Sequence, residues 1–174
     1  MRADIPDISI RSSRLLIEPF RAQDAAESFQ CITSSLARYM SWEAPRSSDE
    51  YENVWRGWLD TIADGSDFVF TLRRQTDARF IGLAGLHNIH GQTPELGIWI
   101  REDEHRCGYG YEAVDAVFQY ASQNTTATCF IYPVAIENLP SRSIAEQLGG
   151  TVIETRSASK YDSVVYGIPR STAP

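Results

Sequence analysis

The chain has 174 residues, 43% of them hydrophobic and 22% charged, which suits one packed domain and excludes a chain disordered throughout. Its net charge is -7 and its longest basic run is Arg73-Arg74, which argues against nucleic acid as a direct partner. No stretch approaches the ~18 apolar residues of a membrane span, and residues 1–10 carry no secretory pattern. We therefore expect a cytoplasmic protein without a membrane partner.

Cysteine and histidine are sparse. The three cysteines lie far apart without a C-x-x-C pair, and the three histidines lack the H-E-x-x-H spacing of a zinc site. The sequence therefore predicts neither a structural disulfide nor a metal site.

The first third of the chain reads as one strand followed by two helices. Residues 14–18 form a short apolar run that is typical of a strand, and Asp24 can cap a helix over residues 25–29. Residues 51–62 place apolar side chains at i, i+3, i+4 and i+7, which predicts a longer helix. Ahead of it stands a capping box formed by Ser47 and Glu50.

The middle of the chain predicts three consecutive strands, at residues 68–73, 80–88 and 95–100. Because only short turns separate them, we expect an antiparallel meander. The remaining predicted elements are a helix over 114–121, a strand over 128–132, a helix between Asn138 and Gly149, and strands over 151–155 and 163–168.

This order of elements predicts the α/β class. No repeat or linker divides the sequence, so we expect a single domain over residues 1–174. Its sheet should be mixed and mostly antiparallel, with about seven strands flanked by about four helices.

The segment from His105 to Ala113 joins a predicted strand to a strongly amphipathic helix. Gly108 and Gly110 would let the backbone approach a ligand closely, and free N–H groups at the helix start would favour an anion such as pyrophosphate. Glycines ahead of a helix are also common in ordinary turns that bind no ligand. The segment does not match G-x-x-x-x-G-K-[ST], so a P-loop nucleotidase is disfavoured.

A second junction of the same kind follows the next predicted strand. Asn138 is a good N-cap and Pro140 suits the first helical turn, and a cap alone would explain both. Two such junctions at the carboxyl ends of strands mark the edge where ligands bind in open α/β sheets.

Nearly the whole chain resembles the GNAT superfamily of acyl-CoA-dependent N-acyltransferases, within it the RimJ/RimL type of ribosomal-protein N-terminal acetyltransferases. The similar segments are residues 14–19, 81–88, 95–100 and 162–166. The family's pyrophosphate loop reads Q/R-x-x-G-x-G/A, which Gly108 and Gly110 match, whereas His105 replaces the first residue. Asn138 and Ser141 match the family's N-x-x-S, and Gly149-Gly150 departs from its usual Gly-Phe.

The resemblance implies an N-acetyltransferase that transfers the acetyl group of acetyl-CoA to a primary amine by direct attack in a ternary complex. The cosubstrate would lie between the fourth and fifth predicted strands, and no metal is needed. A backbone N–H near Ile98 would polarise the thioester, and Gly97 would permit a bulge there. The residues expected to bind acetyl-CoA are Ile98, Trp99, Ile100, His105, Arg106, Cys107, Gly108, Tyr109, Gly110, Tyr111, Asn138 and Ser141.

The chemistry also needs a base for the amine and a proton donor for the departing thiolate. Glu95 is the first choice for the base and His87 the second, although a solvated strand-edge charge and a half-buried ring would explain them equally well. Ser141 is the expected proton donor, with Tyr132 as the alternative. A covalent route through Cys107 is disfavoured because that residue stands near the pyrophosphate loop.

The acceptor pocket should be lined by Tyr39, Met40 and Trp42, unless these side chains simply cover the core. Glu43 and the acidic surface favour a cationic acceptor, which a protein N-terminus or a small amine would satisfy. A homodimer is a family-level expectation. Two alternatives remain open: a non-catalytic acyl-CoA-binding sensor or interaction module, and a nucleotide-binding domain that uses the same glycine loop.

Overall fold

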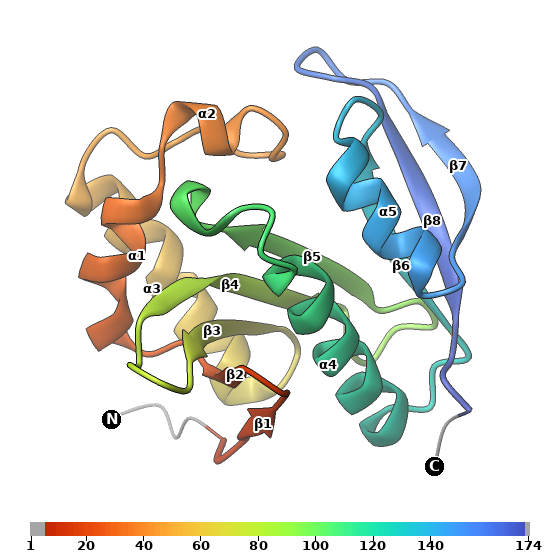
Figure 1. The fold of residues 1–174 in the computed structure, drawn as a ribbon, viewed down its shortest axis with the longest axis horizontal. Coiled ribbons are helices and arrows are strands. Elements are labelled where there is room, and N and C mark those ends of the chain that lie inside the picture. Colours follow the sequence, from red (N-terminus) through yellow and green to blue (C-terminus); the bar gives the residue numbers. More distant parts are fainter. Residues whose placement is uncertain (1–5, 173–174) are drawn as a thin grey trace.

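One mixed sheet runs through the molecule in the strand order β1-β2-β3-β4-β5-β6-β8-β7 (Figure 1). Neighbouring strands are antiparallel except β5 and β6, which are parallel. The structure is a computed structural model and describes residues 6–172. The strands are β1 (Ile10–Arg11), β2 (Leu15–Pro19), β3 (Phe68–Arg74), β4 (Phe80–His87), β5 (Glu95–Ile100), β6 (Cys129–Ala135), β7 (Thr151–Arg156) and β8 (Ser163–Pro169).

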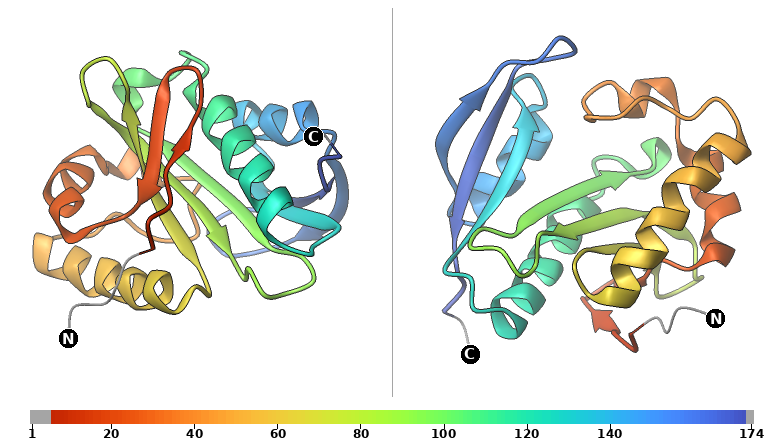
Figure 2. Two further views of the ribbon diagram at one scale, coloured as in Figure 1. Left: turned by 90° about the horizontal axis from the view of Figure 1, so that it is seen from below. Right: turned by 180° about the vertical axis from the view of Figure 1, so that it is seen from behind.

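Helices cover both faces of this sheet (Figure 2). Helices α4 and α5 pack side by side on one face, against β4, β5 and β6, while α1 and α3 lie against β3 and β4 on the other. Within residues 6–172 no helix is long and apolar enough to cross a membrane. The helices are α1 (Ala25–Cys31), α2 (Ser34–Ala37), α3 (Ser48–Asp64), α4 (Tyr109–Asn124) and α5 (Leu139–Gln147). Short 3-10 turns at Ala22–Asp24 and Glu102–Glu104 precede α1 and α4.

The sequence pattern predicted the α/β class and the longer elements correctly. The structure adds strand β1 and helix α2, of 2 and 4 residues, which are too short to show a hydrophobic period. Asp24 stands at the N-cap position of α1 as predicted, but its carboxylate makes no cap hydrogen bond to that helix. It instead accepts hydrogen bonds from Arg21 N, Thr71 Oγ1 and Arg73 Nη2 and so joins the start of α1 to β3.

Large side chains from several strands fill the core between the sheet and the helices. Phe130 of β6 is fully buried and meets Phe118 of α4 edge to face, with ring centroids 5.3 Å apart. Burial of such a ring stabilises the fold by roughly 1.5–3 kcal/mol. This contact anchors α4 over β6, so the helix start stands in a fixed place relative to both central strands.

The sheet splits at its centre. β5 and β6 pair at one register position, Glu95 with Ile131, where Ile131 N donates to the carbonyl of Pro94 at 2.9 Å. Beyond that position the strands diverge, and β6 leaves with β8, to which it is paired over its full length (Figure 1). We call the space between the diverging strands the fork.

The predicted bulge at Gly97 is wrong. The β4–β5 ladder is continuous from His87 opposite Glu95 to Gly82 opposite Ile100. β5 therefore stays paired with β4 along its whole length. The fork opens because β6 turns away from β5 after the Glu95–Ile131 pair, and not because β5 bends at Ile98.

Candidate active site

The loop between β5 and α4 is held in an unusual backbone conformation. Arg106 has φ +62 and Gly108 has φ +81, both in the left-handed region. A side chain at Gly108 would be strained there, which is the physical reason for a glycine at this position. The two turns fold residues 105–108 back onto the start of α4 at the open end of the fork.

This loop presents a row of free donors. In the part of the chain that the structure describes, the main-chain N–H groups of residues 106–111 donate to no other atom, and the next one, of Glu112, reaches the carbonyl of Gly108 at 3.2 Å. Unpaired N–H groups at the positive end of a helix dipole stabilise an anion. The loop can therefore hold a diphosphate without a cluster of lysines.

Gly110 permits a close contact between two helices. A Cβ there would lie 3.1 Å from Cδ1 of Ile144 and 3.9 Å from Cγ1 of Ile100. The missing side chain lets the starts of α4 and α5 close on each other beside the end of β5. Of the two glycines expected to let the backbone approach a ligand, Gly108 thus forms a left-handed turn, and Gly110 allows a close contact between helices.

The side chains of Tyr109 and Tyr111 lie on the far side of α4 from α5. Tyr109 is buried beneath Arg14, whose Cζ stands 4.3 Å from the ring centroid. Tyr111 lines an open groove of about 690 Å³ between α4 and the β1–β2 hairpin. Because both side chains lie on the hairpin side of α4, these two residues could contact a ligand in the fork only through their main-chain atoms.

His105 folds back onto β5. Its Nε2 lies 2.7 Å from the carbonyl oxygen of Ile100, so the imidazole closes the loop against the end of the strand. Cys107 is exposed, and its carbonyl faces the hairpin, where Arg14 Nη1 donates to it at 2.9 Å.

The second junction forms as the sequence predicted. The side chain of Asn138 accepts a hydrogen bond from Ser141 N at 3.4 Å, and Pro140 occupies the first turn of α5. The hydroxyls of Ser141 and Tyr132 are 2.6 Å apart, which joins the two candidate proton donors. Burial raises the pKa of Tyr132 to about 12, against a smaller lowering by the Ser141 hydrogen bond, so the phenol stays protonated at neutral pH.

β5 presents different groups to its two faces. Ile100 faces α4 and α5, and alternation places Ile98 on the same face. Glu95, Gly97 and Trp99 then share the opposite face, where Trp99 is buried against Phe80 with ring centroids 5.7 Å apart. The side chain of Trp99 therefore belongs to the core.

Alternation also decides which main-chain groups of β5 point into the fork. The carbonyl of Pro94 points toward β6, because it accepts from Ile131 N. Main-chain groups two and four residues further along a strand point the same way, so the N–H of Ile98 faces β6 where that strand has already turned away. This N–H is a preformed donor inside the fork.

The candidate bases lie together at the closed end of the fork. His87 is directly opposite Glu95, and Gly85 is opposite Gly97, so all four share one face. The His87 ring lies over Gly85 with Nε2 nearest, while its Nδ1 is 3.6 Å from Oδ2 of Asp67. A side chain at Gly97 would meet nothing within 4 Å, so open space adjoins the imidazole.

The predicted acceptor residues lie in a segment that spans the open end of the fork. Tyr39, Met40 and Trp42 are half-buried, and Met40 and Trp42 pack against the core. One end of the segment is tied to the β5 side, where Glu102 accepts hydrogen bonds from the hydroxyls of Thr33 and Ser35.

The other end is tied to the β7–β8 loop by Lys160. Its ammonium donates to the carbonyls of Ala37 and Trp42 at 3.0 and 2.9 Å and pairs with Glu43 at 2.8 Å. Lys160 is the only lysine of the chain. This rarity is the one feature of the sequence that could have drawn attention to it. We call this set of contacts the Lys160 latch.

Within residues 6–172 no group of three or more His, Cys, Asp and Glu side chains is arranged to hold a metal ion. The fork therefore stands out by its free N–H groups, its paired hydroxyls and its two candidate bases.

Comparison with known proteins agrees with this geometry. A family model described as an acetyltransferase (GNAT) domain matches residues 14–151. Similar solved structures include RimL, a ribosomal L7/L12 alpha-N-protein acetyltransferase in complex with coenzyme A. It has 14% identity and a TM-score of 0.82 over 93% of this chain and 98% of that chain.

Two further structures are RimJ from Mycobacterium smegmatis in complex with CoA-disulfide and spermidine N-acetyltransferase from Vibrio cholerae in complex with CoA and spermine. RimJ has 17% identity and a TM-score of 0.81 over 93% of this chain and 87% of that chain. The spermidine enzyme has 17% identity and a TM-score of 0.78 over 91% of this chain and 96% of that chain. No curated protein sequence matches significantly. These structures share the fold, and the family match covers most of the sequence: the chain belongs to the GNAT acetyltransferase family.

Proposed function

We propose that this protein transfers the acetyl group of acetyl-CoA to a primary amine by direct attack within the fork. The observation that carries the proposal is the single-position pairing of β5 with β6 between two helix starts. It places anion donors at the helix starts and hydrogen-bonding groups along the two diverging strands.

The residues fit the cosubstrate. The free N–H groups of residues 106–111 would hold the diphosphate, and Asn138 at the start of α5 would face the extended arm. Acetyl-CoA itself supplies a thioester with a good leaving group. The N–H of Ile98 would stabilise the negative charge that develops on the thioester oxygen, as an oxyanion donor does.

The amine must lose a proton before it attacks, and His87 is better placed than Glu95 to take it. Its Nε2 lies over Gly85 beside the open space at Gly97, whereas Glu95 sits at the closed end of the fork. Asp67, 3.6 Å from Nδ1, would orient the ring. Glu95 remains the second candidate for the base.

The departing thiolate needs a proton or a strong hydrogen bond. Ser141 at the start of α5 would supply it, with the buried phenol of Tyr132 donating to the Ser141 hydroxyl in turn. Because Tyr132 keeps its proton up to about pH 12, this pair serves over the whole range in which an amine is free to attack.

The acceptor is a primary amine of cationic character. RimL acts on a protein N-terminus and the Vibrio cholerae enzyme on spermidine, and both are amines that are protonated in water. The net charge of -7 would raise the local concentration of such an acceptor.

A thiol-release assay tests the proposal. The full chain is incubated with acetyl-CoA and a panel of amines that contains peptides with free N-termini, polyamines and amino acids, and free CoA thiol is measured. Amine-dependent thiol release is the expected result. Binding of acetyl-CoA without release with any amine would support the sensor or interaction module instead.

A further inference from the structure

Arg14 connects the start of β2 to the loop that follows β5, across 93 residues of sequence. Its Nη1 donates to the carbonyl of Cys107 at 2.9 Å, and its Nε donates to Oε2 of Glu112 at 2.7 Å. The same guanidinium stacks on the ring of Tyr109. One side chain thus touches the loop, the first turn of α4 and the ring between them.

The contact with Cys107 fixes the direction of the next N–H. In a trans peptide the C=O and the following N–H point in opposite directions, and no cis peptide occurs in the described residues. Drawing the carbonyl of Cys107 toward Arg14 therefore turns the N–H of Gly108 away from the hairpin. On the side of α4 away from the hairpin lies α5, since a Cβ at Gly110 would stand 3.1 Å from Cδ1 of Ile144.

Glu112 holds Arg14 in this orientation. Its Oε1 accepts hydrogen bonds from the hydroxyls of Ser12 and Ser13 and from Arg14 N at 2.7, 3.0 and 2.7 Å. Its side chain is only 12% exposed, whereas that of Arg14 is 44% exposed, so water is excluded from the carboxylate side of the pair. The guanidinium is thereby fixed before any ligand arrives, which lowers the ordering cost of binding.

We propose that Arg14 is a positioning residue for the phosphate-binding loop, which aims the Gly108 N–H at the diphosphate of the acyl donor through the carbonyl of Cys107. The inference rests on the proposed function, because it presumes a diphosphate-bearing ligand at the loop. Arg14 does not act on the reacting atoms; it acts on affinity for the phosphate end of the cosubstrate.

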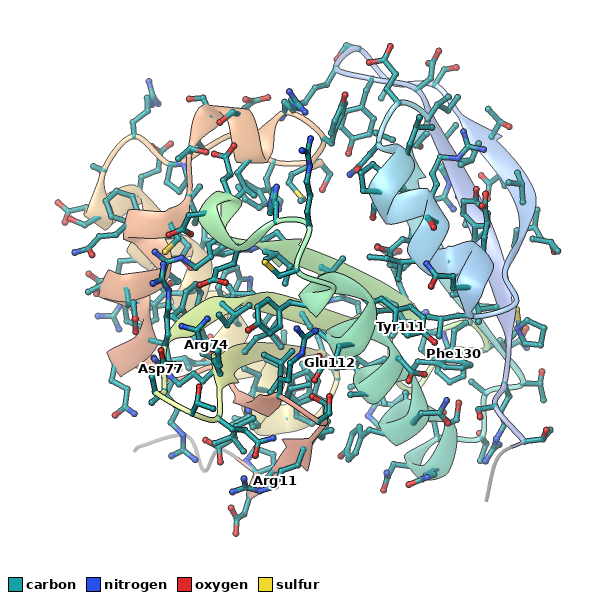
Figure 3. The ribbon with its side chains drawn as sticks, viewed as in Figure 1. Arg11, Arg74, Asp77, Tyr111, Glu112 and Phe130 are labelled. Carbon is teal, nitrogen blue, oxygen red and sulfur yellow. The ribbon has the colours of Figure 1, made fainter. Side chains whose placement is uncertain are left out.

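Arg14→Lys is the diagnostic variant. Lysine keeps the charge and can pair with Glu112, but a single ammonium cannot also reproduce the planar, forked contact with the Cys107 carbonyl. Arg11→Lys is the matched control, because Arg11 stands on the same hairpin and its Nη1 donates to Gln75 Oε1 at 3.4 Å, away from the loop. Figure 3 shows Arg11 on β1 and Glu112 at the start of α4.

Two readouts are needed. Calorimetry gives the Kd for CoA, and kinetics compares acetyl-CoA with acetyl-pantetheine, a thioester that lacks the diphosphate. For Arg14→Lys we expect the Kd for CoA to rise about tenfold, with a similar loss of kcat/KM for acetyl-CoA, as loss of one charge-assisted hydrogen bond implies. The kcat/KM for acetyl-pantetheine should change less than about twofold, and Arg11→Lys should leave all values unchanged.

Equal losses with both thioesters would show a general structural defect and would overturn the proposal, as would an unchanged Kd for CoA or an equal effect of Arg11→Lys. A wild-type chain that binds CoA but releases no thiol with any amine would overturn the catalytic function, while the Kd comparison still decides the role of Arg14. A wild-type chain that binds no CoA would overturn both.

Discussion

His87 and Glu95 face each other across β4 and β5 at the position where the fork begins, and both lie on the sheet face opposite α4. An imidazole and a carboxylate are thus adjacent where an incoming amine would lose its proton. Only one of them needs to be the base, and the two assignments predict that different variants lose turnover.

We expect His87→Asn to lower kcat by about a hundredfold or more, the range usual for loss of a general base. The loss should be greatest below the pKa of the amine, where a base is most needed, and the Kd for CoA should stay within about twofold. The pH dependence of kcat/KM checks this for wild type, His87→Asn and Glu95→Gln. A large loss in Glu95→Gln with a normal His87→Asn would move the base to Glu95, and unchanged turnover in both would remove the base from this pair.

Gly108→Ala should weaken CoA binding about tenfold or more, because φ +81 costs a side chain about 1–2 kcal/mol and the loop would relax away from its donor row. Gly149→Ala is the control, since Gly149 has φ +82 after α5 and open space around it. Thermal unfolding and calorimetry should show similar destabilisation in both variants but weaker CoA binding only in Gly108→Ala. Equal Kd values would mean that the loop does not hold the ligand.

The hydrogen bonds of Glu112 predict an acid-dependent stability. Burial alone would raise its pKa, but the hydrogen bonds from Ser12, Arg14 and Ser13 outweigh burial and hold it below the usual range. A carboxyl with a lowered folded-state pKa stabilises the fold above its unfolded-state pKa of about 4.3, and this stabilisation is lost as the pH falls through the folded value.

Urea unfolding of wild type and Glu112→Gln measures this effect. Wild type should be more stable by about 2 kcal/mol at pH 7, and the gap should shrink between about pH 5 and pH 3. A gap that does not depend on pH would show that the charge of Glu112 contributes nothing and that only its shape matters.

The Lys160 latch predicts an effect confined to the acceptor. Lys160→Met removes all three contacts with Ala37, Trp42 and Glu43 but keeps the length of the side chain. We expect kcat/KM for the amine to fall about tenfold while the Kd for CoA stays constant, because the segment with Tyr39 and Met40 loses its fixed position.

Glu43→Gln is the milder control, since it leaves both carbonyl contacts of Lys160 in place. Because the chain has no other lysine, labelling of Lys160 by an amine-specific reagent, separated by peptide mapping from labelling of the terminal α-amine, also reports on whether the latch is formed. A fall in CoA affinity equal to that in amine kcat/KM would contradict a role limited to the acceptor.

The sequence predicted what depends on local pattern. The periodicity predicted helix α3 correctly, and Ser47 caps it by accepting a hydrogen bond from Glu50 N. The other half of the predicted capping box does not form, because the Glu50 carboxylate accepts from Arg46 N rather than from the N–H of Ser47. The sequence likewise predicted the Asn138 cap and the turn at Gly108, because each depends on the backbone conformation of only a few neighbouring residues.

What the sequence could not predict is non-local. The Arg14–Cys107 and Lys160–Trp42 contacts join residues 93 and 118 positions apart, and no short pattern records them. The wrong prediction of a bulge at Gly97 has the same origin, because the fork depends on the pairing of β6 with β8. The side-chain orientations of Trp99 and Tyr111 also follow from packing that only the fold reveals.

Thermal unfolding with acetyl-CoA, CoA, ATP and NAD tests the central claim, a site in the fork for an acyl-CoA, most directly. A ligand at a hundredfold excess over its Kd stabilises the native state by about 2.7 kcal/mol, which raises the unfolding midpoint by several degrees. We predict such a shift with acetyl-CoA and CoA and none of similar size with ATP or NAD. A shift with ATP or NAD that equals the CoA shift, or no shift at millimolar acetyl-CoA, would contradict the assignment of the fork as an acyl-CoA site.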